Sequence, residues 1–137
     1  MRKIILANVA EGTHAGNITK CANEAITKKY LLGKLTTDGK IAIAGENDTP
    51  IGVITDEAAG ADEIVNVALL GSGDTLKMTA GGAITAGSIV VPAQGGKVRE
   101  LPGKAGTYLQ IGIALNSASS DGIVECVSCL PTQYVHA

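Results

Sequence analysis

The chain has 137 residues, with 13 acidic and 11 basic side chains, three Tyr, and neither Trp nor Phe. A chain of this length can form one domain that buries roughly 68% of its unfolded surface, and the core of that domain must be aliphatic. The formal net charge is −2 and the basic residues are scattered, which excludes the basic surface typical of nucleic-acid-binding proteins.

The first ten residues, MRKIILANVA, combine two basic side chains with a short apolar run that Asn8 interrupts. A secretory signal needs a longer apolar core, and no later segment has the length of apolar sequence that crosses a bilayer. We therefore expect an intracellular protein without contact to a membrane. Residues 1–24 are expected to form an N-terminal arm or first strand.

Short segments rich in Ile and Val, each bounded by Gly, Asp, Asn or Pro, predict an all-β fold. Residues 22–34 contain good helix formers, but the related segment 81–93 does not, so we expect turn and strand in both. Strands at such short spacing predict a small β-barrel or sandwich. The predicted strands are residues 40–44, 50–55, 63–70, 88–91, 108–115 and 122–130.

The sequence also repeats itself at spacings of 57 to 60 residues. The strings AIT, GK and IG in the first half recur in the same order in the second half, and the turns TTDGK and AQGGK take equivalent places. Asp-Gly and Gly-Gly between apolar runs are typical of tight hairpins. We therefore predict two similar β-units, at residues 25–70 and 83–130, with a linker at 71–82 and a tail at 131–137.

Duplication would stabilise the fold, because one such unit leaves an apolar face exposed and a second unit can cover it. The repeat would then build a scaffold. Specificity is expected in what the copies do not share, namely the N-terminal segment, the tail and the unequal loops.

Three cysteines are an odd number, which favours reduced thiols over a disulfide framework. Cys126 and Cys129 form a CxxC motif, but side chains three apart in a strand point to opposite faces. Without a second CxxC or a His at ligand spacing, we expect buried or half-buried strand cysteines and neither a metal site nor redox activity.

Candidate catalytic groups are few. His14 and His136 lie near opposite ends of the chain and are expected to be ordinary exposed residues. The acidic cluster Asp56, Glu57, Asp62 and Glu63 could bind a cation or serve in acid/base chemistry, yet the matching loop keeps only Asp121, which favours a solvated loop. The string GSGD lacks the residues of a phosphate-binding loop, and no Gly-x-Ser-x-Gly elbow occurs. We expect no enzyme activity and no cofactor.

Three successive segments carry a resemblance: PIGVITDEAAGADEIVNVALLG, MTAGGAITAGSIVVPAQGGKV and GTYLQIGIALNSASSDGIVECVSCL. In this order they resemble the small head decoration, or capsid cement, proteins of tailed bacteriophages, over about residues 20–130. The motifs mark a fold and carry no chemistry. The longer N-terminal part and the two cysteines of the CxxC motif depart from the shorter members of that family.

The resemblance implies a non-enzymatic virion protein on the outer surface of the head, made in the host cytoplasm. It implies the major capsid protein as partner and a homo-oligomer, with a trimer favoured. Because it lies outside both copies, the N-terminal segment is expected to include the main capsid contact, and such an arm could order on binding. The residues concerned are Arg2, Lys3, Ile4, Ile5, Leu6, Asn8, Val9 and Ile18.

Two other function classes fit the residues less well. A β-rich ligand- or carbohydrate-binding module, or a phage tail component, is compatible with the fold, although sugar sites usually rely on aromatic rings and these are scarce here. A biotinyl or lipoyl carrier would present a modified lysine at a hairpin tip, and LKMTAGG around Lys77 is a poor match to such a motif.

Overall fold

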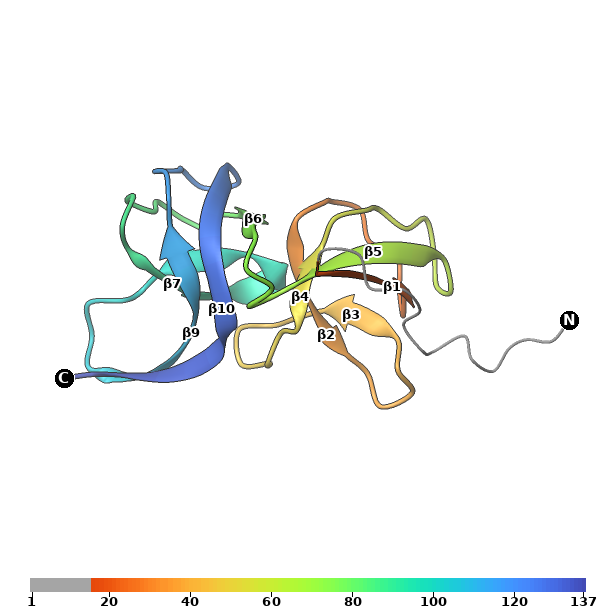
Figure 1. Cartoon of the computed structure of the whole chain (residues 1–137), viewed down its shortest axis with the longest axis horizontal. Coiled ribbons are helices and arrows are strands. Elements are labelled where there is room, and N and C mark those ends of the chain that lie inside the picture. Colours follow the sequence, from red (N-terminus) through yellow and green to blue (C-terminus); the bar gives the residue numbers. More distant parts are fainter. Residues whose placement is uncertain (1–15) are drawn as a thin grey trace, which may run out of the picture.

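The computed structural model describes residues 16–137, which form ten strands in two five-stranded antiparallel sheets (Figure 1). The first sheet has the order β1-β5-β4-β2-β3 and consists of β1 (Asn17–Cys21), β2 (Leu31–Leu35), β3 (Ile41–Ile43), β4 (Gly52–Ile54) and β5 (Ile64–Leu69). The second has the order β6-β10-β9-β7-β8 and consists of β6 (Thr75–Thr79), β7 (Ile89–Pro92), β8 (Val98–Glu100), β9 (Gly106–Ala114) and β10 (Ile123–His136), with a short 3-10 turn, η2 (Gln94–Gly96), between β7 and β8.

The two sheets have the same topology. Each strand of the first sheet corresponds to the strand five places later in the chain, and this substitution converts one strand order into the other. The predicted all-β fold built from two similar units is thereby confirmed. Below, the first unit denotes the strands β1 to β5 and the second unit the strands β6 to β10, each with its connecting loops.

The equivalence extends to the loops. The isolated bridge between Ile26 and Ala58 recurs between Ile84 and Ala118. Asp62 and Asp121 take up positive φ angles of 71° and 66° at equivalent turns. Each of these aspartates also receives a lysine from the hairpin of its own unit, with Nζ–Oδ1 distances of 2.7 Å for Lys40–Asp62 and 2.6 Å for Lys97–Asp121. The repeated sequence therefore encodes repeated backbone geometry and one repeated ion pair.

One strand lies where none was predicted, and another runs beyond its predicted end. Strand β6 lies within the segment 71–82 that was predicted to be a linker, and only the turn at 71–74 connects the units. Strand β10 continues through Pro131 into the predicted tail and ends at His136. A β-bulge lies between Ser128 and Thr132, where the register with β9 shifts, and a bulge is one of the few strand sites that accept proline.

Most of the buried apolar side chains fall into two clusters. One lies inside the first unit and consists of Ala22, Ile26, Ile41, Ile54, Ala58, Val65 and Val67. The other fills the second unit and continues into the junction between the units, where Leu32, Ala44, Val53, Ala68 and Leu70 join it from the first unit. The core is thus aliphatic, as the composition predicts.

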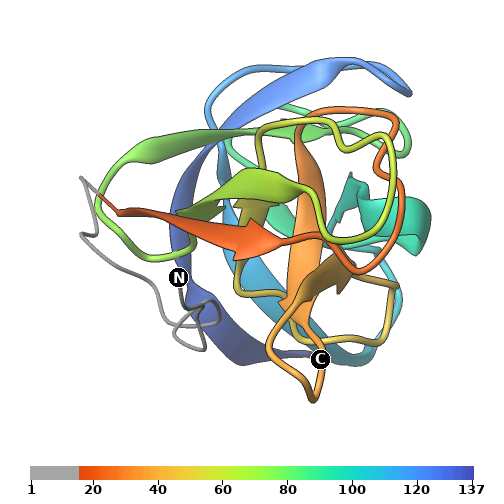
Figure 2. The same ribbon diagram turned by 90° about the vertical axis from the view of Figure 1, so that its right-hand side faces the viewer.

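The units are stacked along the long axis of the molecule (Figure 1), and a view along that axis shows the first unit in front of the second (Figure 2). The junction is formed by β2 and β4 of the first unit and by β6 and η2 of the second. The backbone N–H of Thr79 donates to the carbonyl oxygen of Tyr30 over 3.0 Å. Gly96 approaches so closely that a Cβ built there would lie 2.8 Å from Cγ2 of Ile43.

Candidate interaction surfaces

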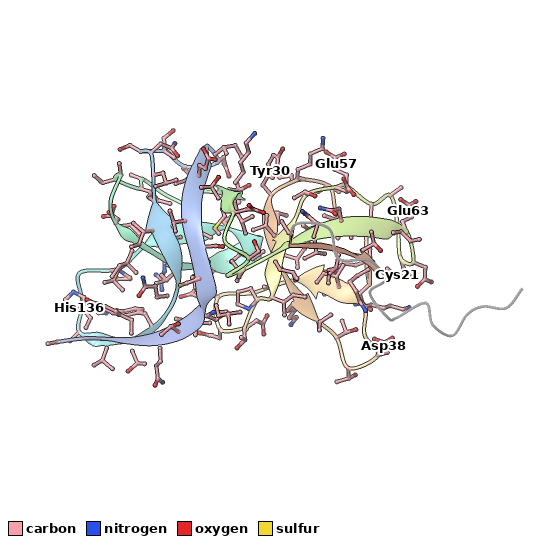
Figure 3. The ribbon with its side chains drawn as sticks, in the orientation of Figure 1. Cys21, Tyr30, Asp38, Glu57, Glu63 and His136 are labelled. Atoms are coloured by element: carbon pink, nitrogen blue, oxygen red, sulfur yellow. The ribbon has the colours of Figure 1, made fainter. Side chains whose placement is uncertain are left out.

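Within residues 16–137, no group of three or more His, Cys, Asp or Glu side chains gathers where it could hold a metal ion. Figure 3 shows His136 at the opposite end of the molecule from Cys21 and Asp38. The described part of the chain also contains no helix of the length and apolarity that crosses a membrane. His14 lies outside the described residues.

The cysteines of the CxxC motif lie in β10 with different environments. Cys126 is fully buried, and this burial raises the pKa of its thiol to about 12. Cys129 is half-buried beside the bulge, where its Sγ lies 3.8 Å from the carbonyl oxygen of Gln110, and burial raises the pKa of this thiol as well. Both thiols are therefore protonated near neutral pH, and both are free in this structure.

The acidic cluster at 56–63 organises its own loop. A carboxylate oxygen of Asp56 accepts the backbone N–H of Asn66 over 2.8 Å, and one of Glu63 accepts the N–H of Ala59 over 2.9 Å. Asp62 pairs with Lys40. These carboxylates are thus engaged separately in turns and an ion pair, and they do not converge on a common point.

Of the predicted capsid contacts, Arg2, Lys3, Ile4, Ile5, Leu6, Asn8 and Val9 lie outside the described residues. Ile18 lies in β1 and packs, partly buried, against the core of the first unit. Its cross-strand partner is Val67, which is fully buried. Ile18 therefore has a structural role in the first unit.

Lys77 lies in the middle of β6, opposite Glu125 of β10, and not at a turn. Its Nζ is 5.8 Å from the centre of the Tyr30 ring, a cation–π contact across the junction. Figure 3 shows Tyr30 on the side of the first unit that faces the second. A lysine in this position stabilises the junction and lacks the hairpin-tip geometry of a carrier domain.

A polar groove of about 430 Å³ opens beside the junction. Loop residues 46–49 of the first unit form one wall, and residues of β7, β8, β9 and β10 form the other. Arg99 donates to Glu46 across the groove over 3.1 Å, while its Nε is buried without a hydrogen-bond partner. In the loop, the hydrogen bond from Lys34 to Asp48 lowers the pKa of that carboxyl group. The groove could receive a polar side chain.

Exposed apolar side chains concentrate in the second unit. Eight large hydrophobic residues of the described chain are exposed, and six of them lie on or directly after β9 and β10. These six are Ile113, Leu115, Ile123, Val127, Leu130 and Val135. The first unit contributes only Leu35 and Ile64. Sequence reasoning missed this apolar surface, although the alternation of buried and exposed residues from 123 to 128 follows the period of a strand with one outward face.

Comparison with known proteins gives a likeness in fold. No protein-family model matches the chain, and no curated protein matches it. Among solved structures, the chain is similar to "The crystal structure of head fiber gp8.5 N base in bacteriophage phi29", with a TM-score of 0.62 and 21% sequence identity. The likeness covers 85% of this chain and 95% of that one. At this level of identity, the comparison establishes the shared fold.

Proposed function

We propose that the chain is a non-enzymatic structural protein of a phage virion, which binds the outside of the head and stabilises contacts between major capsid subunits. The observation that carries this proposal is the likeness in fold, over 85% of the chain, to the base of a phage head fiber. The resemblance of three sequence segments to head decoration proteins supports the same location, because it rests on the sequence and not on the fold comparison.

The physical character of the described residues fits this role. The core is aliphatic, the connections are short, and two sheets are joined by packing, backbone hydrogen bonds and ion pairs. The groove and the apolar outer surface of β9 and β10 offer contacts that do not require a reacting group. A cement protein gains its affinity from many moderate contacts of this kind.

The N-terminal segment remains the proposed main contact with the capsid. Because Ile18 packs against the core of the first unit, the contact is better assigned to residues 1–15 than to the whole of 1–18. A truncation that tests it should keep β1, which begins at Asn17. On the head we propose a homo-oligomer, with a trimer favoured.

The test is co-sedimentation with undecorated, expanded phage heads on a density gradient. Three proteins are compared: the full chain, a variant lacking residues 1–15, and the full chain with Ile4, Ile5 and Leu6 all replaced by Ser. The proposal predicts saturable co-migration of the full chain and at least a tenfold weaker association of both variants, since three aliphatic anchors are lost. Circular dichroism and thermal melts verify that each variant keeps its β-fold.

Two results would argue against parts of the proposal. If the full chain fails to bind heads that a known decoration protein does bind, the head-binding role is wrong and a tail component or ligand-binding module gains support. If the variants bind as well as the full chain, the arm is not the contact. The proposed capsid-binding surface would then have to lie within residues 16–137.

A further inference from the structure

The two units differ in whether their outer sheet face is covered. We define the outer face of each unit by three side chains that lie in one cross-strand row, at equivalent ladder positions. In the first unit they are Leu32, Val53 and Ala68, and in the second unit Ile89, Ile113 and Val127. The first row is buried, with Val53 at 0% exposure, whereas Ile113 and Val127 are 42% and 51% exposed.

The first outer face is buried because its three side chains belong to the apolar cluster that fills the second unit. The end of the second unit that meets this face is called the docking end, and we mark it by three residues around its rim, Thr79, Pro92 and Gly96. These contact the surroundings of the face: Thr79 donates its backbone N–H to Tyr30, Pro92 is buried next to the loop 46–49, and Gly96 lies against Leu31 and Ile43. The two units thus meet through unlike surfaces, an outer face against a docking end.

The docking end of the first unit is open in the described chain. Its equivalent residues are Cys21, Leu35 and Gly39, because β1 corresponds to β6, β2 to β7, and the two hairpin turns to each other. Leu35 is 48% exposed where its counterpart Pro92 is buried, and Gly39 is only half-buried where Gly96 is buried. The molecule therefore ends in an uncovered outer face on one side and an uncovered docking end on the other.

We propose that the outer face of the second unit binds the docking end of the first unit in a second copy of this chain. The occupant follows from the stack itself, because the same two kinds of surface already bind each other once within the chain. Such a contact joins unlike surfaces, so it is heterologous and closes into a ring or continues as a row. The proposal does not depend on the protein binding a phage head.

The contact between copies lacks the polar links of the junction within the chain. Glu46 and Arg99 form an ion pair across that junction, but the position equivalent to Arg99 is Ala42. Lys28 lies 3.8 Å from Asp121, and the corresponding segment at 85–86 is Thr-Ala. Apolar contacts without these links give a weak association, which forms where the protein is concentrated.

The experiment is sedimentation velocity on the full chain over a concentration series up to about 1 mM, where a contact with a Kd of that size is half occupied. We expect the average mass to rise with concentration above the 13.8 kDa of one chain. Val127→Asp blocks the outer face and Leu35→Asp blocks the docking end, so each variant should weaken association at least tenfold. Val135→Asp, which changes an exposed residue outside both surfaces, is the matched control and should associate as the parent does.

Mixing the two blocked variants distinguishes the proposed contact from a symmetric one. Leu35→Asp retains its outer face and Val127→Asp retains its docking end, so the mixture should form dimers that grow no further. A protein that stays monomeric throughout overturns the proposal. So does a symmetric dimer, in which Val127→Asp abolishes association and Leu35→Asp has no effect. Thermal melts of all variants must match the parent, and Ile113→Ser replaces Val127→Asp if the latter does not fold.

Discussion

The two β-units share one strand order, one pattern of loop bridges and one lysine–aspartate pair, yet the surroundings of equivalent residues differ. Val53 and Ile113 occupy the same place in the two sheets, but Val53 is at the centre of the junction and Ile113 is exposed. A repeated sequence pattern therefore determines a repeated fold and leaves open which copies of a face are buried. Whether a face is buried depends on the position of its unit in the stack.

The second unit also differs by an extension. Strand β10 has 14 residues against six in β5, and its last part pairs with the first part of β9 beyond the bulge. The first unit has no counterpart of this ladder. The extension supplies Tyr108 and Gln133 to the groove beside the junction, so the part that is not repeated forms a surface that the repeat alone would lack.

The largest expected effect comes from placing the same charge at two equivalent positions. Val53→Asp buries an unpaired carboxylate in the junction and should lower the free energy of unfolding by roughly 3 to 5 kcal/mol. Ile113→Asp changes an exposed residue and should alter it by about 0.5 kcal/mol or less. Urea denaturation at low protein concentration measures both, and equal losses would contradict the assignment of buried and open faces.

A smaller effect is expected at the turn that touches the first unit. Gly95 and Gly96 both have positive φ angles, of 69° and 77°, so an alanine at either is strained by about 1 kcal/mol. A Cβ at Gly95 meets no atom within 4 Å, whereas one at Gly96 would lie 2.8 Å from Cγ2 of Ile43. Gly96→Ala should therefore cost roughly 2 to 3 kcal/mol and Gly95→Ala about 1, as measured by thermal unfolding. Equal costs would mean that the junction is looser than described.

A third change makes the two cores more alike. Cys126 in the second unit occupies the place of Val67 in the first, and both are fully buried. Cys126→Val should change the free energy of unfolding by about 1 kcal/mol, because both side chains are apolar and the swap adds only about one methyl group to the core. Thiol titration at pH 8 gives an independent check. In the native state the parent and the variant should react to the same extent, whereas after denaturation the variant should show one reactive thiol fewer than the parent. Rapid labelling of native Cys126 would contradict its burial.

The smallest effect is the pH dependence of one surface carboxylate. The hydrogen bond from Lys97 lowers the pKa of Asp121, and the positive charges of Lys97 and Lys28 lower it further. The folded state therefore gains stability from the ionised carboxylate above the ordinary pKa of 3.8, and loses it as the pH falls through the lower folded value. Asp121→Asn should lower the Tm at pH 7, and its difference from the parent should shrink toward pH 2.

The matched control for this prediction is Asp62→Asn, which removes the equivalent ion pair in the first unit. Asp62 pairs with Lys40 alone, whereas Asp121 also lies near Lys28 of the other unit. The control should therefore lower the Tm at pH 7 by less than Asp121→Asn does. A difference between Asp121→Asn and the parent that stays constant from pH 7 to pH 2 would show that the ion pair contributes no stability.

Much of the strand pattern could be predicted from the sequence, because β3, β4, β5 and β7 are short apolar runs between turn residues. Strands β1 and β6, with the sequences NITKC and TLKMT, contain polar residues that hide the period. Both lie at the edge of a sheet and become strands by pairing with β5 and β10. Local propensity does not report such pairing, which depends on residues far away in the chain.

The interaction surfaces could be predicted only in part. The offsets of the repeat identify Val53 and Ile113 as equivalent residues, but both belong to aliphatic strands and nothing local distinguishes the buried copy from the exposed one. The groove is assembled from loop 46–49 and four later strands, so its existence depends on how the units stack. The last strand was predicted to end at residue 130, whereas β10 continues through Pro131 because a bulge accommodates the proline, and that bulge is a tertiary feature.

The most direct test of the proposed role is a cryo-electron microscopy comparison of expanded heads with and without the added full chain. The proposal predicts extra density on the outer surface, at contacts between major capsid subunits, into which the two stacked units fit. Extra density confined to the tail, or heads that look identical under saturating protein, would contradict it.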